Sequence, residues 1–481
     1  MSEKTTETNS RGKIIGLVLG IVTFLGLYFM PLPAGMTPVS QTSLALFVAA
    51  LVLWVAKPIP IYQTSILAIL LLPLLGAVKK QSEAFGTLGY DIIWLMVAAF
   101  VLTSAMSASN LGKRIALVLV TRFGKTPVRT LAVLVVVNFI LAFFVPSTTA
   151  RASLLVPITL VLLEVYKAMP GKSQFGRLMM LEGVQNNAFA TSMVVTATSA
   201  QVLAMGFINQ QTGATVGYMQ WLLGSLPQAV LAAILSFLIG LKMYSFKDEI
   251  KDVGTKAIDM LKGQLEEMGP LSIKEKKAAI IFLFTLLLWA TGDYQKGWFG
   301  FAISTEQTAV LSMFLCLLPK VGVITWKEAK IKWDLMLFSA GAYAVGNALD
   351  KSGGASWLIN KLIAAVHLDQ MDTTVVAIVL IFISVYSHLI FTSKTVRTTI
   401  LIPAVIGLAK QLGMDPVPLA LVCSFAIACT ITLPPHSKVN TLYFGTGYFD
   451  VKDELIYGLV SCFLVSCSIC AVYFGWIRFV L

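Results

Sequence analysis

The chain has 481 residues, of which 57% are hydrophobic and only 12% are charged. Soluble domains carry about 25% charged residues, so this composition excludes a soluble globular protein and indicates an all-α protein that crosses a membrane many times. The net charge of +12 is typical of lysine- and arginine-rich loops that contact anionic membrane lipid. Nucleic acid is not an expected partner, because no basic stripe is interleaved with aromatic residues.

Apolar segments follow one another along the chain in two sets. The first set lies near 14–31, 42–56, 60–78, 91–108, 129–145, 152–166, 189–208 and 218–243. The second set lies near 278–291, 302–319, 334–349, 374–391, 398–412, 417–433 and 455–480. The charged stretch between them predicts a first repeat, 1–245, a linker, 246–277, and a second repeat, 278–481. Clusters of lysine and arginine predict that the linker and the amino terminus are cytoplasmic.

A five-residue motif occurs once in each half. Residues 147–151 read Ser-Thr-Thr-Ala-Arg and residues 393–397 read Ser-Lys-Thr-Val-Arg, so both follow the pattern Ser-x-Thr-x-Arg. Each copy continues in an apolar run to a proline, Pro157 or Pro403. Matched polar clusters at membrane depth in two related halves point to the substrate site of a transporter.

The motifs separate apolar segments that are short for full spans, which need about 20 residues. We therefore expect two re-entrant helical hairpins, at about 129–166 and about 374–412, with the motifs at their tips. Unpaired backbone at such a tip is tolerated only inside the protein or against a watery cavity. A turn between two full spans is the alternative.

Each half also has a later break in an apolar segment. Residues 196–201 read Thr-Ala-Thr-Ser-Ala-Gln, and residues 433–438 read Leu-Pro-Pro-His-Ser-Lys. The two prolines of the second stretch interrupt a helix, because proline lacks the amide hydrogen that the helix needs. A hairpin followed by a broken transmembrane helix in both halves predicts two repeats, and an odd number of crossings in each makes them inverted.

Helix breaks of this kind favour an anionic substrate. The amide groups of a new helix amino terminus attract anions, and serine and threonine hydroxyls add donors for a carboxylate. Two tips that meet near the middle of the membrane would hold the two ends of a dianion. The alternative is that the hydroxyls only cap helices, which is compatible with binding. The candidate substrate-binding residues are Ser147, Thr148, Thr149, Ser393, Lys394 and Thr395.

Other polar residues near the motifs are candidates for substrate contact or charge balance: Arg151, Arg397, Thr198, Pro435 and His436. The two arginines occupy matched positions, and either balance substrate charge or lie behind the tips and pair with acidic groups. His436 is a candidate for pH sensitivity, with a satisfied interior histidine as the alternative. We expect neither a metal ion nor a cofactor.

The first motif resembles the Ser-Asn-Thr signature of the divalent anion/sodium symporter (DASS) family, especially its branch of bacterial citrate/succinate antiporters. Residues 442–448, Leu-Tyr-Phe-Gly-Thr-Gly-Tyr, also resemble that branch, and the likeness extends from Pro31 to the final helix. The resemblance implies a multi-pass protein of the bacterial cytoplasmic membrane. It further implies a homodimer with a fixed scaffold and an elevator-type transport domain, in which motif serines and threonines bind substrate carboxylates.

The sequence departs from the family motif where sodium is bound. Thr148 and Lys394 replace the two asparagines, and Ala197 stands where the symporters tend to have a glycine. A lysine ammonium has three donors and no acceptor, so it cannot ligate sodium, but it supplies a positive charge that cannot leave. We therefore expect sodium-independent antiport of C4–C5 dicarboxylates such as succinate, malate, fumarate and 2-oxoglutarate.

Two other functions compete with this prediction. The first is a sodium-coupled di- or tricarboxylate symporter that uses backbone carbonyls in place of the missing asparagines. The second, more remote, is an intramembrane enzyme. No HExxH motif, acidic pair or GxSxG-like nucleophile lies in an apolar run, and the tip hydroxyls lack an adjacent general base. The sequence therefore predicts a transporter that is not an enzyme.

Overall fold

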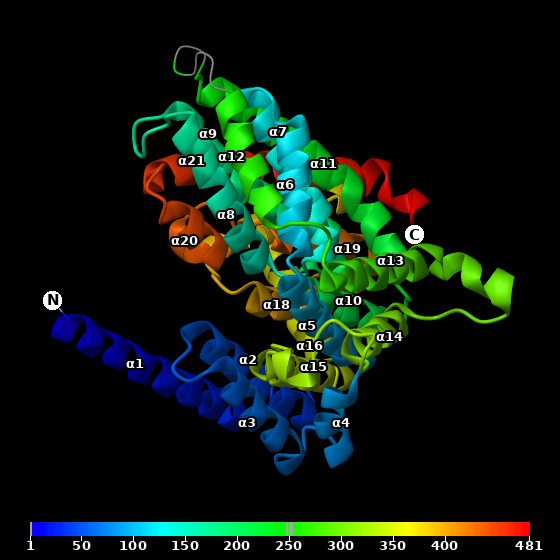
Figure 1. Ribbon diagram of the computed structural model, residues 1–481. Coiled ribbons are helices and arrows are strands. Elements are labelled where there is room, and N and C mark those ends of the chain that lie inside the picture. The colour runs from blue at the N-terminus through cyan, green and yellow to red at the C-terminus, as the bar shows by residue number, and fades with distance from the viewer. Residues whose placement is uncertain (1, 247–248, 250–253) are drawn as a thin grey trace.

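The computed structural model describes residues 2–246, 249 and 254–481, and every regular element in these ranges is a helix (Figure 1). The helices before the masked stretch are α1 (Ser2–Phe29), α2 (Pro38–Ala56), α3 (Ile61–Leu74), α4 (Gln81–Phe85), α5 (Asp91–Ser109), α6 (Leu111–Phe123), α7 (Pro127–Phe144), α8 (Thr148–Val165), α9 (Gln174–Met193), α10 (Ser199–Thr212) and α11 (Tyr218–Met243).

The second part of the chain continues the same architecture. Its helices are α12 (Gly254–Glu267), α13 (Ile273–Phe299), α14 (Thr305–Leu317), α15 (Trp333–Lys351), α16 (Gly354–Val366), α17 (Thr373–Tyr386), α18 (Lys394–Gln411), α19 (Pro416–Ile427), α20 (Lys438–Phe444) and α21 (Val451–Gly475). Short 3₁₀ turns lie at Gly86–Gly89, Val195–Ala197, Trp326–Glu328, Leu368–Gln370, Ser387–Leu389, Pro434–His436 and Ile477–Phe479.

Seven helices in the described ranges are long and apolar enough to cross a membrane. They are Gly12–Phe29, Pro38–Ala56, Gln81–Ser109, Pro127–Phe144, Thr148–Val165, Tyr218–Met243 and Val451–Gly475. Several others are apolar but shorter, among them Ile61–Leu74 and Pro416–Ile427. A mixture of full-length and short apolar helices is what a polytopic protein with interrupted spans requires.

The helices form two groups (Figure 1). The lower group contains α1–α4, α15 and α16, and its closest packing is between α1 and α2 and between α3 and α15. The upper group contains α6–α12 and α17–α21, and carries both motifs. Helices α5, α13 and α14 lie between the two groups, where α5 packs against both α13 and α14. The site is therefore built almost entirely within the upper group.

Both motifs lie at the turns of helical hairpins. The first hairpin is α7 and α8, and the second is α17 and α18, with a 3₁₀ turn at 387–389 after α17. Each second helix begins earlier than the apolar pattern predicts, at Thr148 instead of 152 and at Lys394 instead of 398. The reason is that Ser147 and Ser393 cap these helices, so the rest of each motif forms the first helical turn.

Both expected helix breaks are present. Helix α9 ends at Met193 and α10 begins at Ser199, with a 3₁₀ turn at 195–197 between them. Helix α19 ends at Ile427 and α20 begins at Lys438, with the turn at 434–436 between them. Extended backbone precedes α10 and α20, because their N-cap residues Thr198 and Ser437 both lie in the β region.

The two hairpins run in opposite directions from their tips. The Asn187 side chain, near the end of α9, donates to the carbonyl of Thr148, so α8 runs back along α9. Helix α18 instead runs parallel to α10, because Thr398 bonds Ala200 at their starts and Lys410 bonds Gln211 at their ends. Because α10 continues from α9 toward the lower group (Figure 1), this arrangement is the one that inverted repeats produce.

The charged linker is partly helical. Part of the stretch 246–277 lies outside the described residues, but α12 packs against α6 and α8. Glu275, at the start of α13, accepts a 2.6 Å hydrogen bond from Nε of Arg114 on α6. This guanidinium, together with Ser272, holds the pKa of the Glu275 carboxyl below its usual range. The linker is therefore fixed to the upper group by an ion pair.

Candidate functional site

Four helix amino termini form the candidate site, namely those of α8, α10, α18 and α20. The Ser147 hydroxyl accepts from the amide of Ala150 at 3.3 Å, and the Ser393 hydroxyl accepts from the amide of Val396 at 3.4 Å. The hydroxyl of Ser437 caps α20 in the same way. Helix amino termini carry partial positive charge and unpaired amides, so four of them in one body favour an anion.

The tips and breaks contact one another in pairs. The first tip touches α9 through the Asn187–Thr148 bond of 3.1 Å, and the start of α18 touches the start of α10 through the Thr398–Ala200 bond of 3.2 Å. Helices α20 and α8 also pack together. Elements from both halves of the sequence therefore lie against one another in the candidate site.

Three motif side chains make no hydrogen bond within the part of the chain that the structure describes. Thr148, Thr149 and Lys394 make no side-chain hydrogen bond to any residue that the structure describes, while Thr395 bonds only the Ser393 hydroxyl, at 3.1 Å. All four are partly exposed, whereas the next residues along α18 are buried. These hydroxyls and this ammonium are available to a ligand.

Thr198 lies at the same kind of position in the first break. It is the N-cap residue of α10, but its side chain makes no capping bond. It is partly exposed, between the buried Ala197 and the partly exposed Ser199. Its hydroxyl therefore belongs with the free motif hydroxyls.

Arg151 and Arg397 lie behind the tips and fix them to the broken helices. Arg151 donates to the carbonyls of Val145, at 3.0 Å, and of Asn187, at 3.3 Å, and also to the hydroxyl of Thr191. Both arginine side chains are fully buried. Of the two positions that the sequence left open for the arginines, the structure shows the one behind the tips.

Arg397 makes the equivalent set of bonds in the second half. It donates to the carbonyls of Ser384, at 2.8 Å, and of Ile427 and Cys429, both at 3.3 Å, and to the hydroxyl of Ser387. The predicted pairing with acidic groups is wrong for both arginines, since no described carboxylate lies within ion-pair distance. Carbonyl dipoles hold these guanidinium groups but leave their charge uncompensated.

The result is a strongly positive interior around the tips. The charges of Arg397 and Arg151 both act on the ammonium of Lys394, which brings cations from both halves into one electrostatic environment. Because like charges in a low-dielectric region repel one another, an anion between the tips is stabilised by all three. The arrangement suits a ligand with more than one negative charge.

The second break contains a histidine network. His388 Nε2 contacts the Thr432 hydroxyl at 2.9 Å, and the same hydroxyl contacts His436 Nδ1 at 3.0 Å. His436 is buried, which favours a satisfied interior histidine over a free pH sensor. Pro435 and Lys438 are instead exposed beside it.

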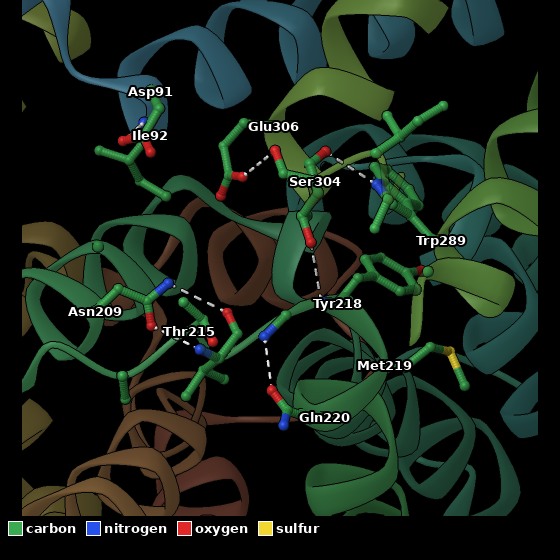
Figure 2. A pocket seen from close by; sticks show the side chains of 18 of the residues that line it. Asp91, Ile92, Asn209, Thr215, Tyr218, Met219, Gln220, Trp289, Ser304 and Glu306 are labelled. Atoms are coloured by element: carbon green, nitrogen blue, oxygen red, sulfur yellow. Dashed lines mark hydrogen bonds between the residues drawn. The ribbon is translucent and has the colours of Figure 1, made fainter. Parts of the chain in front are cut away.

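A cavity lies away from the tips, where α10 ends and α11 begins (Figure 2). Its volume is about 640 Å³, and its lining includes Asp91, Glu306 and Tyr218 but no lysine, arginine or histidine. Trp289 stacks on Tyr218 at 4.2 Å and donates to the carbonyl of Thr305. An acidic lining repels a dianion, so this cavity is not the candidate site.

Trp289 separates that cavity from the first tip. The same side chain also lines a much smaller cavity bordered by Pro146 and Thr196, which belong to the first tip and the first break. The small cavity has room for about one water molecule. In this conformation the tip is therefore closed off from the acidic cavity.

The sequence pattern missed several buried polar residues around the site. Asn187 and Thr191 contact the first tip, and Glu182 lies five residues before Asn187 on the same helix. The Glu182 side chain is buried within α9. The run of polar residues 185–187 inside an otherwise apolar helix is a signal that could have identified this buried seam.

Comparison with known proteins assigns the chain to a family. The profile described as "Sodium:sulfate symporter transmembrane region" matches residues 11–481. The chain belongs to the divalent anion/sodium symporter family. It is therefore a multi-pass transporter of a bacterial plasma membrane and not an enzyme, as the motifs predicted.

Curated relatives match nearly end to end. The chain is 27% identical to the "Citrate/succinate antiporter" of Escherichia coli (strain K12), over 92% of this chain and 94% of that protein. It is 25% identical to the "Sodium-dependent dicarboxylate transporter SdcS" of Staphylococcus saprophyticus, over 98% and 93%. It is 28% identical to the "Putative malate transporter YflS" of Bacillus subtilis, over 76% and 75%.

A solved structure supports the fold. The crystal structure of the Alcanivorax borkumensis YdaH transporter aligns with a TM-score of 0.57 over 98% of both chains, at 13% identity. The prediction of an all-helical membrane protein with many spans is thereby confirmed. The names of the family relatives include both an antiporter and sodium-dependent transporters, so family membership does not decide how this chain couples transport.

Proposed function

We propose that this transporter exchanges C4–C5 dicarboxylates, such as succinate, malate, fumarate and 2-oxoglutarate, across the cytoplasmic membrane without sodium. The substrate class rests on relatives named as citrate/succinate, dicarboxylate and malate transporters. The binding residues are Ser147, Thr148 and Thr149 of the first tip, with Ser393, Lys394 and Thr395 of the second. Thr198 adds a free hydroxyl from the first break.

The observation that carries the exchange mode is the placement of Lys394. It is the first residue of α18, between the tip hydroxyls of Ser393 and Thr395, and makes no described ion pair. Burying an unpaired charge is unfavourable, so it is stabilised when a carboxylate of the substrate lies beside it. Sodium in a symporter would leave with the substrate, whereas this charge stays.

An exchange cycle follows from that permanent charge. With a dianion bound, the site carries little excess charge and can cross the membrane. Once the dianion leaves, Lys394 and the two buried arginines lose their counter-charge, and moving them through a low-dielectric path is costly. Loading a second dianion from the other side restores the crossing-competent state.

The movement in this proposal is of elevator type. The upper group, with both re-entrant hairpins and both broken helices, would be the transport domain, and the lower group would be the fixed scaffold of each subunit in a homodimer. The unequal roles of the two groups support this division, because the upper group holds all candidate binding residues. The antiparallel hairpins would give the site similar tips toward each membrane face.

The second candidate function is sodium-coupled symport. It is favoured by the name of the SdcS relatives and by backbone carbonyls at the breaks, which are suitable oxygen donors. Lys394 argues against it, because an ammonium offers no lone pair to a cation and repels one nearby.

Counterflow in liposomes tests the proposal. Vesicles that contain the protein and unlabelled succinate should accumulate labelled succinate from a choline buffer without sodium. A panel of unlabelled competitors then defines which dicarboxylates share the site. Accumulation that occurs only with sodium would refute exchange and favour symport, and no competition by any dicarboxylate would refute the substrate class.

A further inference from the structure

Two buried glutamates in the upper group have no cationic partner. Glu182 of α9 is 3% exposed and Glu454 of α21 is fully buried. Neither forms an ion pair with any described residue, and neither belongs to a motif. An ionised carboxylate in such a place is costly unless it is paired, so each carries a proton in this conformation.

The hydrogen bonds around Glu182 can accommodate an added hydrogen. The Tyr457 hydroxyl contacts both the Glu182 carboxyl and the carbonyl of Ser236, the latter at 2.8 Å. A tyrosine has one hydrogen to donate, so it cannot serve both acceptors. If Glu182 is protonated, it donates to the tyrosine oxygen, and the tyrosine hydrogen goes to Ser236.

Glu454 presents an even simpler case. Neither of its carboxylate oxygens has a hydrogen-bond partner among the described residues. The side chain lies beside Asn440 of α20, whose amide donates to the carbonyl of Leu433 and whose oxygen accepts from Ser437. A protonated carboxyl here is neutral, whereas an ionised one would need water to enter or the neighbouring break to move.

Each glutamate is connected to the candidate site through asparagines. Glu182 bonds Asn186 at 2.5 Å, and the adjacent Asn187 holds the first tip at Thr148. Glu454 adjoins Asn440, which holds the cap of the second break. Changes in occupancy at the tips can therefore reach both carboxyls over one or two hydrogen bonds.

The other titratable groups near this seam are few. Around Glu182, α8 contributes Arg151, α20 contributes Tyr443 and α21 contributes Tyr457, while Tyr244 directly follows the end of α11. The ion pair of Arg177 with Asp453, at 3.1 Å, lies near the Glu454 end. The tyrosines stay neutral near physiological pH and the charges of the ion pair cancel, so Arg151 is the one uncompensated charge among these groups.

We propose that Glu182 and Glu454 are proton-binding sites that release their protons when the transport domain is empty. The proposal rests on the exchange function and adds a second route to it. Arg151, Arg397 and Lys394 give the upper group three interior positive charges, and a bound dianion with two neutral glutamates leaves one. With the dianion gone and both glutamates ionised, one positive charge again remains.

A proton fits these positions better than a metal ion. A hard cation needs several converging oxygens, and among the described residues no group of three or more histidine, cysteine, aspartate or glutamate side chains is placed to hold a metal ion. One oxygen of the Glu182 carboxyl is hydrogen-bonded to the Tyr457 hydroxyl and the other accepts from the Asn186 amide. Both carboxyl oxygens therefore already have partners, and no set of oxygens converges on a cation.

The charge balance predicts how pH controls net transport. At low pH the glutamates stay protonated, an empty domain carries three charges, and only exchange proceeds. At higher pH the glutamates ionise after the dianion leaves, and the empty domain can return. Net efflux should therefore rise with pH while counterflow changes little, and two protons should leave with each dianion.

The experiment compares net efflux and counterflow in the same liposomes between about pH 6.5 and about pH 8.5, where free dicarboxylic acids are mostly ionised. Efflux of labelled succinate into succinate-free choline buffer measures the return of the transport domain without substrate. A pH dye trapped inside the liposomes measures how many protons move. Linkage predicts that the rate of net efflux rises by up to about tenfold per pH unit for each proton released. A rise with sodium instead of pH would overturn the proposal.

Glutamine substitutions provide the matched test, because they mimic a permanently protonated glutamate. Glu182→Gln and Glu454→Gln should each reduce the pH slope of net efflux, and the double variant should lose net efflux but retain counterflow. Glu164→Gln, at an exposed position on α8, is the control and should change neither. A double variant with an unchanged pH slope would overturn the proposal, whereas absent counterflow in the unsubstituted protein would instead refute exchange.

Discussion

Within each Ser-x-Thr-x-Arg motif, the residues that the two copies share have different structural roles. The serine caps the second hairpin helix, and the arginine donates to carbonyls of its own hairpin and of the neighbouring broken helix. The residue after the serine is not needed for either task, and it is the one that differs between the copies, Thr148 in one and Lys394 in the other. The second position is therefore where chemistry can change without loss of the tip's structure.

Replacement of Lys394 by asparagine tests that freedom. Because the variant has no permanent charge at the second tip, Lys394→Asn should lose sodium-free counterflow or make it dependent on sodium, while the protein still folds. Labelled succinate uptake in choline and in sodium buffer measures both effects. The exposed Lys327→Asn serves as control, and unchanged sodium-free kinetics in Lys394→Asn would exclude an essential charge there.

Replacement of an arginine by lysine should act on stability. Lysine keeps the charge of Arg151 but cannot reach the carbonyls of Val145 and Asn187 together, so Arg151→Lys should lower the free energy of unfolding by about 2–4 kcal/mol. Thermal unfolding in detergent, with and without succinate, measures this loss. If the role is anchoring, the folded fraction should keep an unchanged KM, and a large rise in KM with normal stability would indicate direct substrate contact.

Among the helices and turns, the sequence predicted those that are determined by residues close in the chain. The hairpins and the breaks were predictable because proline, serine and threonine interrupt apolar runs at 146–149, 392–395 and 434–437. The starts of α8 and α18 were placed too late, since a capped first turn made of polar residues does not look helical in a hydropathy pattern. The capping serines themselves carry the missing information.

What the sequence could not provide is the pairing between distant elements. The carbonyl acceptors of Arg397 come from α17 and from the end of α19, and their backbone groups leave no trace in residue type. The contact of Glu182 with Tyr457 was not predictable, because the two residues lie 275 positions apart. Such contacts depend on how the helices pack, which one sequence does not reveal.

The Arg114–Glu275 pair should hold the linker to the upper group. Glu275→Gln removes the charged hydrogen bond and should lower the free energy of unfolding by about 1–2 kcal/mol at neutral pH. Because the pKa of Glu275 is depressed in the folded state, this contribution is present above its unfolded value, about 4.3, and is lost as pH falls through the folded value.

Thermal unfolding of both proteins across pH measures that difference. The two melting temperatures should converge in acid, and the exposed Glu328→Gln should show a smaller effect at neutral pH. A gap between Glu275→Gln and the unsubstituted protein that widens in acid would contradict a depressed folded-state pKa.

Over the whole molecule, the two groups are in direct contact where α16 packs against α18. One close approach is between Gly407 of α18 and Ile359 of α16, where a Cβ atom on the glycine would lie 2.1 Å from the isoleucine side chain. The glycine thus lets the upper group lie directly against the lower group. An elevator motion must slide these two helices past each other, so their contact can exist in only part of the cycle.

A disulfide across that contact tests the motion. In the variant Gly407→Cys with Ile359→Cys, oxidation should link α18 to α16 and stop counterflow, and a reductant should restore it, because the upper group can no longer move against the lower group. The same treatment of each single variant controls for modification of the native cysteines. Gly16→Cys with Ala56→Cys links α1 to α2 inside the lower group and should leave counterflow intact. Full counterflow in the oxidised Gly407–Ile359 pair, with the crosslink verified by mass spectrometry, would show that transport does not require the two groups to slide.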